Sequence, residues 1–310
     1  MTVMKNLFHK SKPNKTDDRI NSLKRNQAAI INKKTPFIIQ EAYKTARTNT
    51  IFSVSGSMEN SCKVIAITSA GPGEGKTTTT INLAITFAQT GAKVLIIDGD
   101  LRKPRVHQYL GVVKTDGLST VLSNQKTFDE VVYKNIREGL DLLASGSIPP
   151  NPAELLSSDA MGETLKELKK RYDYIFLDTP PVTVVTDAAA LSKFIDGIIL
   201  IVRQDYTAHE NIEQALNLLK IADAKVLGFF VNDVQSPNVS YRSYKNGRYS
   251  YRYGYGGKRG YSYNYRYGSA YGDKAEYKVD DNGNRVDLAA NNTAANNTET
   301  NVSDSVSDNE

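Results

Sequence analysis

The glycine-rich segment at residues 69–78, Ser-Ala-Gly-Pro-Gly-Glu-Gly-Lys-Thr-Thr, constrains the fold of this chain more than any other feature. An apolar run of strand length precedes it at 62–68, and a helical apolar pattern follows it at 81–88. Strand, glycine-rich turn, Gly-Lys-Thr and helix together form a P-loop, whose backbone N–H groups and helix start surround phosphate oxygens. Ala70 stands where the pattern usually has glycine, and alanine is small enough to be tolerated there.

The loop chemistry predicts a site for a nucleotide with β- and γ-phosphates and Mg²⁺. Lys76 is expected to reach the β- and γ-phosphates, and the Thr77 hydroxyl is expected to reach Mg²⁺. A glycine-rich turn that binds nothing is the alternative, and the flanking strand and helix argue against it. The candidate nucleotide-binding residues are Gly71, Gly73, Glu74, Gly75, Lys76, Thr77, Thr78 and, at the end of a later strand, Asn232.

Short apolar runs alternate with helical patterns through the middle of the chain. We expect strands at 93–97, 139–143, 173–177, 197–202 and 225–231, and helices at 161–171, 186–194 and 207–221. Such alternation, together with the P-loop, predicts the α/β class and a P-loop NTPase fold: a mostly parallel sheet with helices on both faces. Ligands of such sheets bind beyond the carboxyl ends of the strands.

Carboxylates stand at these predicted strand ends. Asp98 and Asp100 follow one strand, and Asp178 follows another. Mg²⁺ bound to a nucleotide takes hard oxygen ligands, so Thr77, Asp98 and Asp178 are the metal candidates. Because two carboxylates at one strand end exceed what one metal needs, Asp98 or Asp100 is a candidate base for an attacking hydroxyl. Simple capping of the strand end is the alternative for both.

The two ends of the chain differ in composition from the middle. Residues 1–35 carry nine Lys and Arg against two Asp, and we expect them to be basic and largely disordered. Tyrosines dominate residues 238–279, where seven basic residues lie at 239–272, and residues 280–310 are expected to be a disordered acidic and polar tail. The single cysteine excludes a disulfide framework, and no run approaches the roughly 18 apolar residues of a membrane-spanning helix.

A helical pattern at residues 40–52 opens the predicted folded domain, which we place at 36–237. Glu41, Lys44 and Arg47 recur at three-residue steps and fall on one face of that helix. A solvated charged face is the ordinary explanation of such spacing.

Together these segments resemble the bacterial tyrosine kinases, in particular the cytoplasmic kinase of Gram-positive exopolysaccharide and capsule operons. The resemblance rests on Glu-Gly-Lys-Thr at 74–77, VLIIDGDLRKP at 94–104, IFLDTPP at 175–181, PPNPAELL at 149–156 and the tyrosine cluster. Partitioning ATPases share this fold but lack the cluster, and they usually carry an additional lysine early in the loop, which is absent here.

The resemblance implies a protein-tyrosine autokinase that regulates exopolysaccharide or capsule synthesis and export. Lys76 and Thr77 would bind ATP with Mg²⁺. Lys76, Asp98 and Asp100 would be catalytic, and Asp178 would bind the metal. The helix residues Glu41, Lys44 and Arg47 match an oligomerisation motif, with Lys44 in place of an arginine, and imply a homo-oligomer, expected to be a ring. The tyrosines implied to be phosphorylated in trans are Tyr241, Tyr244, Tyr249, Tyr251, Tyr253, Tyr255, Tyr261, Tyr263, Tyr265, Tyr267, Tyr271 and Tyr277.

The resemblance also implies partners and a location. These are a transmembrane activator of the same pathway, a cognate phosphotyrosine phosphatase, and a cytoplasmic position at the inner face of the membrane through the activator. Two alternative interpretations of the sequence remain beside the resemblance to tyrosine kinases. A partitioning ATPase would hydrolyse ATP and leave the tyrosines unmodified. A tail that binds single-stranded nucleic acid would stack bases on its tyrosines, although we expect no stable nucleic-acid binding.

Overall fold

One sheet of seven strands, in the order β3-β4-β2-β5-β1-β6-β7, forms the centre of the folded domain. The computed structural model describes residues 15–54, 61–113, 115–234, 277–279 and 285–287. The strands of this sheet are β1 (Lys63–Ser69), β2 (Val94–Asp98), β3 (Tyr133–Arg137), β4 (Leu140–Leu143), β5 (Tyr174–Asp178), β6 (Gly197–Arg203) and β7 (Val226–Asn232).

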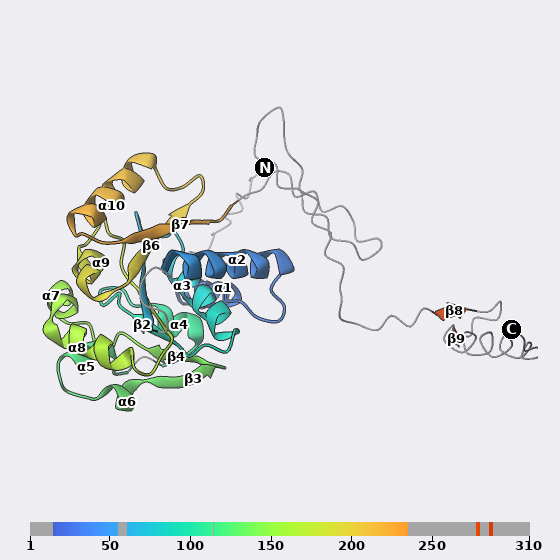
Figure 1. Ribbon diagram of the computed structural model, residues 1–310, viewed down its shortest axis with the longest axis horizontal. Helices are drawn as coiled ribbons and strands as arrows, with labels where there is room; N and C mark the ends of the chain where they lie inside the picture. The colour runs from blue at the N-terminus through green and yellow to red at the C-terminus, as the bar shows by residue number, and fades with distance from the viewer. Residues whose placement is uncertain (1–14, 55–60, 114, 235–276, 280–284, 288–310) are drawn as a thin grey trace, which may run out of the picture. The chain divides into compact units, whose positions relative to one another are not determined.

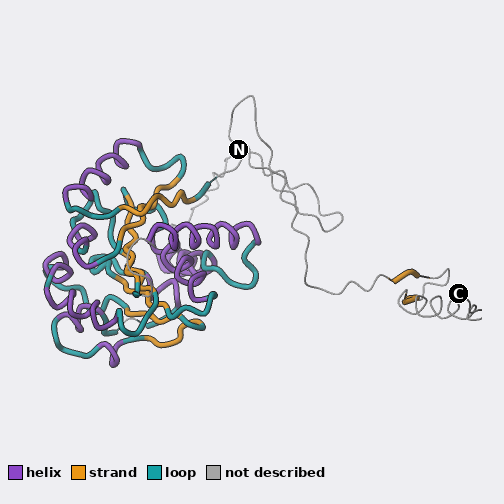
Figure 2. The backbone as a smooth tube through the Cα atoms, viewed as in Figure 1, coloured by secondary structure: helices purple, strands orange, loops and turns teal. Residues whose placement is uncertain are grey.

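Helices cover both faces of the sheet, as Figures 1 and 2 show. On one face, α2 and α3 contribute buried side chains to a core with β1 and β2, and on the other face α8 and α10 do so. The helices are α1 (Lys15–Ala28), α2 (Phe37–Val54), α3 (Lys76–Ala88), α4 (Val106–Leu110), α5 (Leu118–Leu122), α6 (Phe128–Val131), α7 (Pro152–Ser157), α8 (Asp159–Leu168), α9 (Asp187–Ala190), the 3₁₀ turn η1 (Ser192–Phe194) and α10 (His209–Ile221).

The sheet is mostly parallel, which confirms the predicted fold class. β1 pairs in parallel with β5 and β6, and β2 pairs in parallel with β4 and β5. Every residue of β1 and β2 is buried, because helices cover both faces of these central strands. The antiparallel edge strand β3 was not predicted; its sequence, Tyr-Lys-Asn-Ile-Arg, is largely polar, and most of its residues remain exposed.

The N-terminal segment corrects the expectation that residues 1–35 are largely disordered. Residues 15–28 form helix α1, and Ile30 and Ile31 are buried, at 2% and 3% exposure. Asn82 of α3 holds this segment with both halves of its side-chain amide: Oδ1 accepts the Ile31 N–H at 2.8 Å, and Nδ2 donates to the Ala29 carbonyl at 3.0 Å. Tertiary contacts therefore order a segment whose own composition is polar.

Replacing Asn82 by alanine is expected to destabilise the protein by about 2–4 kcal/mol. The Asn82 side chain is buried, so the change leaves the Ile31 N–H and the Ala29 carbonyl without their partner. Urea unfolding measures the loss, with the exposed Asn49→Ala in α2 as the matched control, expected to stay within about 0.5 kcal/mol of the native protein. Equal stability of both variants would show that the two hydrogen bonds of the Asn82 side chain contribute nothing to the stability of the fold.

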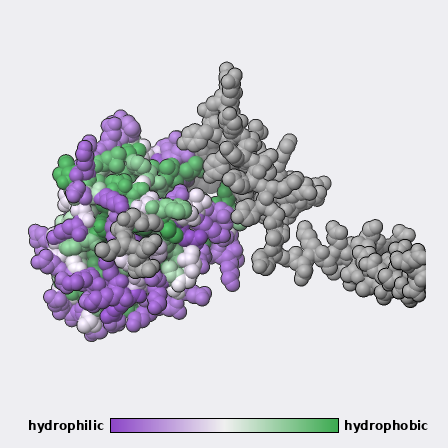
Figure 3. Space-filling view, viewed as in Figure 1, coloured by the Kyte–Doolittle hydropathy of each residue, from purple (hydrophilic) through white to green (hydrophobic). Residues whose placement is uncertain are grey.

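The edge strand β7 leaves apolar side chains exposed. Phe229 and Val231 of β7 are 52% and 51% exposed, and Ile221 at the end of the neighbouring helix α10 is also exposed. Hydrophobic residues gather in the upper part of the domain in Figure 3, where Figure 1 labels β7 and α10. Among the residues that the structure describes, no helix combines the length and hydropathy needed to cross a bilayer.

A second unit begins at Ser236. In it, β8 (Tyr277–Val279) and β9 (Arg285–Asp287) pair antiparallel, with Lys278 opposite Val286. The expectation of disorder throughout 280–310 is therefore wrong for the residues of β9. Apart from Tyr277, the tyrosines of the predicted cluster lie outside the described residues, as do residues 1–14.

Candidate functional site

The P-loop joins β1 to α3 at the carboxyl end of the sheet. Gly75 precedes the helix with φ 93°, and a Cβ there would lie 2.1 Å from Nδ2 of Asn232, so only glycine fits. Because Gly75 has no side chain with which to cap α3, the first N–H groups of the helix are left to another acceptor. The start of this 13-residue helix therefore suits an anion.

Thr77 and Asp178 meet beside this helix start. The Thr77 hydroxyl donates to Oδ2 of Asp178 at 2.6 Å, and the Thr80 hydroxyl lies 3.3 Å from the other carboxylate oxygen. Burial raises the pKa of Asp178 to about 6, although the charge of Lys76 and the Thr77 hydrogen bond act to lower it. The predicted P-loop and strand-end residues are therefore brought together.

Asp98 and Asp100 lie at the end of the adjacent strand. Asp98 stands opposite Asp178 in the parallel register of β2 and β5, is fully buried, and accepts the Val106 N–H through Oδ2 at 3.2 Å. Asp100 is less buried and accepts the Lys103 N–H at 2.9 Å. Its charge contributes to the raised pKa of Asp178, which places Asp100 in the same cluster.

Arg102 follows this acidic pair and is held by a buried carboxylate. Its Nε and Nη2 each donate to one oxygen of Asp187 at 3.0 Å, a forked geometry that arginine alone can form. The Asp187 side chain is fully buried at the start of α9. The pair ties the loop after β2 to the segment that follows β5, which fixes the surroundings of Asp100.

Of the predicted nucleotide-binding residues, Glu74 lies within the P-loop and Asn232 contacts the P-loop from the end of β7. The Glu74 side chain is buried, and Nδ2 of Asn232 donates to the Glu74 carbonyl at 2.9 Å. Direct contact of either residue with a nucleotide stays a prediction.

The three residues predicted to mediate oligomerisation differ in their contacts. Lys44 forms a half-exposed ion pair with Glu41 at 2.7 Å, whereas Nη1 of Arg47 donates to the Thr86 carbonyl of α3 at 2.6 Å. Arg47 therefore also supports the packing of α2 on α3, and the oligomer role of all three stays a prediction.

Sequence reasoning missed several residues around the loop. Thr80 lies three residues after Thr77 on α3, and this spacing was the available signal that both hydroxyls share a helix face. Arg203, Tyr206 and Thr207 reach the P-loop from more than 120 residues along the chain, and no sequence motif marks them.

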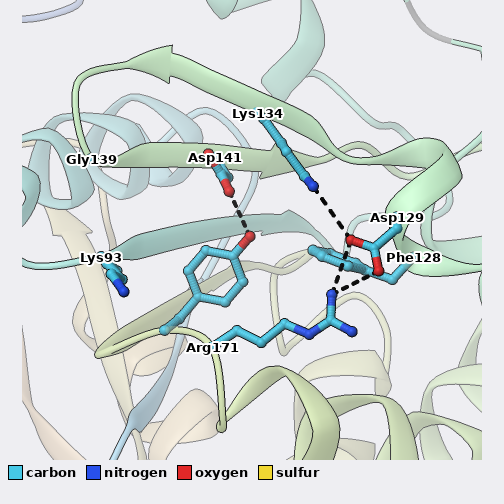
Figure 4. A pocket seen from close by; sticks show the side chains of 8 residues that line it. Lys93, Phe128, Asp129, Lys134, Gly139, Asp141 and Arg171 are labelled. Carbon is cyan, nitrogen blue, oxygen red and sulfur yellow. Dashed lines mark hydrogen bonds and ion pairs between the residues drawn. The ribbon is translucent and has the colours of Figure 1, made fainter.

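A hollow of about 260 Å³ lies away from the P-loop, at the opposite end of the strands (Figure 4). Its lining includes Lys93 and Gly139, which immediately precede β2 and β4. Its acids bond to groups of this chain: Asp129 accepts from Arg171 at 2.9 Å, and Asp141 accepts from the Tyr172 hydroxyl at 2.6 Å. Burial raises the pKa of Tyr172. We therefore assign this hollow to stabilisation of the fold.

Comparisons with known proteins identify relatives of this chain. A family model described as an AAA domain matches residues 62–227. Tyrosine-protein kinase YwqD of Bacillus subtilis (strain 168) is 42% identical over 215 residues, which cover 69% of this chain and 89% of that protein. CapB of Staphylococcus aureus is 34% identical over 224 residues, covering 72% of this chain and 94% of that protein.

Several solved structures are also similar to this chain. The chimerical protein CapA2B2 superposes with a TM-score of 0.63 at 35% identity, covering 67% of this chain and 91% of that one. The kinase domain of the Escherichia coli tyrosine kinase ETK superposes with a TM-score of 0.60 at 31% identity, covering 70% and 80%. With its P-loop, its strand-end carboxylates and these relatives, the chain belongs to the bacterial tyrosine-protein kinases.

Proposed function

We propose that this chain transfers the γ-phosphoryl group of ATP to tyrosines at 241–277 of a second copy of itself. The observation that carries the proposal is the contact between the Thr77 hydroxyl and the Asp178 carboxylate beside the uncapped start of α3. This contact supports a role for Thr77 and Asp178 as a metal-binding pair beside the proposed phosphate-binding loop. Lys76, the first residue of α3, supplies a positive charge for the phosphates.

The oxygen donors of this site fit Mg²⁺. Within the described ranges, no three His, Cys, Asp or Glu side chains are grouped to hold a metal by themselves. Magnesium in phosphoryl-transfer sites takes one or two protein oxygens and completes its shell with substrate phosphates and water. Thr77 and Asp178 would hold it, with Asp98 nearby, and the ion would neutralise charge on the phosphates.

The proton of the attacking tyrosine needs an acceptor, and Asp98 and Asp100 are the candidates. They differ in access, since Asp98 is fully buried and Asp100 is partly exposed. Phosphoryl transfer depends mainly on positioning and charge, so either carboxylate would act by orienting the hydroxyl and taking its proton. The Arg102–Asp187 pair keeps the loop that carries Asp100 in place.

Phosphorylation would change the charge of the tyrosine-rich segment. Residues 239–272 carry seven basic and no acidic residues, and each phosphotyrosine adds about −1.5 to −2. About four phosphates would therefore reverse the sign of the segment. We propose that the unmodified segment docks in the site of a neighbouring copy, and that accumulated negative charge releases it and dissolves the oligomer.

The proposal extends to the cellular role. Named relatives are tyrosine-protein kinases, and one similar structure is the chimerical protein CapA2B2. These support a role in regulating exopolysaccharide or capsule synthesis and export, with a transmembrane activator holding the kinase at the inner face of the membrane. The exposed apolar side chains of β7 support the presence of a partner surface. A cognate phosphatase would reset the phosphorylated tail.

Incubating the full chain with ATP and Mg²⁺ tests this proposal. We expect phosphotyrosine within residues 241–277, mapped by mass spectrometry, and its loss when a chelator removes Mg²⁺. The matched control is a chain with the twelve cluster tyrosines replaced by phenylalanine, which should bind nucleotide and incorporate almost no phosphate. ATP hydrolysis without phosphotyrosine in the native chain would instead favour the partitioning-ATPase reading.

A further inference from the structure

Five successive carbonyl groups of the P-loop each accept a hydrogen bond from a side chain. The Ala70 carbonyl accepts from Thr183, and the Gly71 carbonyl accepts from Ser69 at 2.6 Å. The next three accept from the last residues of β6 and β7 and from the turn after β6: Pro72 from Tyr206 at 3.3 Å, Gly73 from Arg203 at 3.5 Å and Glu74 from Asn232 at 2.9 Å.

A further hydrogen bond holds the Glu74 side chain inside the P-loop. The Thr207 hydroxyl donates to Oε1 of the buried Glu74 at 2.8 Å and accepts the Arg203 N–H at 2.8 Å. A Cβ at Gly71 would lie 3.3 Å from the same Glu74 oxygen, so the carboxylate packs tightly within the turn. Thr207 thus links the P-loop to the turn between β6 and α10.

The donors are themselves held in place. Arg203 and Asn232 stand opposite each other in the register of β6 and β7, whose ends lie together in Figure 1. Arg203 also bonds Asp233 through Nε and Nη2, at 2.9 and 2.7 Å, and its guanidinium lies 5.0 Å from the centre of the Tyr206 ring. Arg203, Tyr206, Thr207 and Asn232 are therefore linked to one another. We call these four residues, together with Thr183, the outer brace.

We infer that the outer brace holds the P-loop in its phosphate-binding conformation, with Thr207 as its central positioning residue. A carbonyl and the following N–H point in roughly opposite directions across a peptide plane. Because these carbonyls point to the brace, the N–H groups that follow them point away from it and are left for a phosphate. A loop with three glycines among residues 71–75 would otherwise sample many conformations. The inference rests on the proposed nucleotide site and names the residues that prepare it.

The brace predicts a particular kinetic pattern for Thr207→Val, which keeps the shape and removes the hydroxyl. If fewer molecules hold the binding-competent loop, the apparent Kd for ATP rises by the inverse of that fraction. We expect the Kd and KM for ATP to rise about tenfold, the scale of one lost hydrogen bond to a charged group. The value of kcat at saturating ATP should change little, because bound nucleotide restores the loop.

Titration of the full chain with fluorescent ATP in Mg²⁺ buffer, together with kcat, KM and Tm, tests the inference. Thr207→Ser keeps the hydroxyl and should restore native affinity. Thr86→Val removes a buried hydroxyl that bonds the Leu83 carbonyl away from the loop, and it should leave KM unchanged whatever its effect on Tm. The exposed Tyr206→Phe, which retains the ring, should weaken ATP binding in the same direction and less, and serves if Thr207→Val does not fold.

Native affinity and KM in folded Thr207→Val and Tyr206→Phe would overturn the brace while leaving the nucleotide site intact. A lower kcat with unchanged KM would also overturn it, because that pattern is what a loss of active molecules produces. If the native chain binds no ATP, both the proposed nucleotide site and the inferred role of the outer brace are wrong.

Discussion

Lys76→Met protein is expected to fold normally and to lose autophosphorylation by at least about 10²- to 10³-fold. Removing one preorganised charge or donor from a transition state costs about that much in kcat. Lys76 is the first residue of α3, is partly exposed, and lies near enough to Asp178 to act on its pKa. Loss of this charge should therefore remove phosphate stabilisation without opening the core.

The control for this variant is Lys76→Arg, which keeps the charge but changes its shape and should recover only part of the activity. Phosphotyrosine is quantified in purified protein after incubation with ATP and Mg²⁺, and circular dichroism checks the fold. A folded Lys76→Met protein with native autophosphorylation would place the phosphate site elsewhere.

Asp178→Asn is expected to abolish activity and yet to stabilise the protein in the absence of nucleotide and Mg²⁺. Burial raises the pKa of Asp178 to about 6, whereas an unfolded aspartate has a pKa of about 3.9. Between these values the folded state binds more protons than the unfolded state, so stability falls as pH rises from about 4 to about 6. Above that window the free energy of unfolding of the native protein has fallen by up to about 3 kcal/mol. The Asp178→Asn variant carries a neutral amide and should not show this decrease.

Thermal unfolding at several pH values tests this expectation. The native protein and Asp178→Asn should differ little near pH 4, and the variant should have the higher Tm at pH 7.5. Asp187→Asn is the matched control, since Asp187 is also fully buried but its charge is paired with Arg102. Weakening that pair should lower Tm at pH 7.5.

Ligand binding should reverse the order of stability. ATP with Mg²⁺ should stabilise the native protein by mass action and should have much less effect on Asp178→Asn, which lacks the metal-binding carboxylate. Equal pH profiles for the native protein and Asp178→Asn would contradict the destabilising burial of this carboxylate.

The sequence was sufficient to predict six of the seven strands of the sheet, and to predict that the P-loop lies near the strand-end carboxylates, because both depend on local patterns. Buried parallel strands are short continuous apolar runs, and the P-loop, Asp98 and Asp178 stand at their ends in fixed positions. Once the strands are parallel, their carboxyl ends must meet, and this brings Thr77 to Asp178 across 101 residues.

Features that depend on tertiary contacts could not be predicted in this way. Helix α1 has a polar sequence, and the chain that follows it is fixed by Asn82, which looks like any polar residue of an amphipathic helix. Thr207 and Tyr206 act through single hydroxyl groups whose partners lie far away in the sequence. The hydrogen bond from Arg47 to the Thr86 carbonyl is likewise a tertiary contact, between α2 and α3, that no sequence pattern marks.

Phosphoryl transfer from one copy of the chain to another is tested most directly with two copies that can be told apart. Native protein truncated after Asp233 serves as the kinase, and isotope-labelled full-length Lys76→Met protein serves as the acceptor, with ATP and Mg²⁺. Mass spectrometry then maps phosphate on the labelled chain. We expect phosphotyrosine within residues 241–277 of the acceptor, and none when the truncated kinase also carries Lys76→Met. An acceptor that stays unmodified, beside a full-length native chain that phosphorylates itself, would contradict transfer in trans.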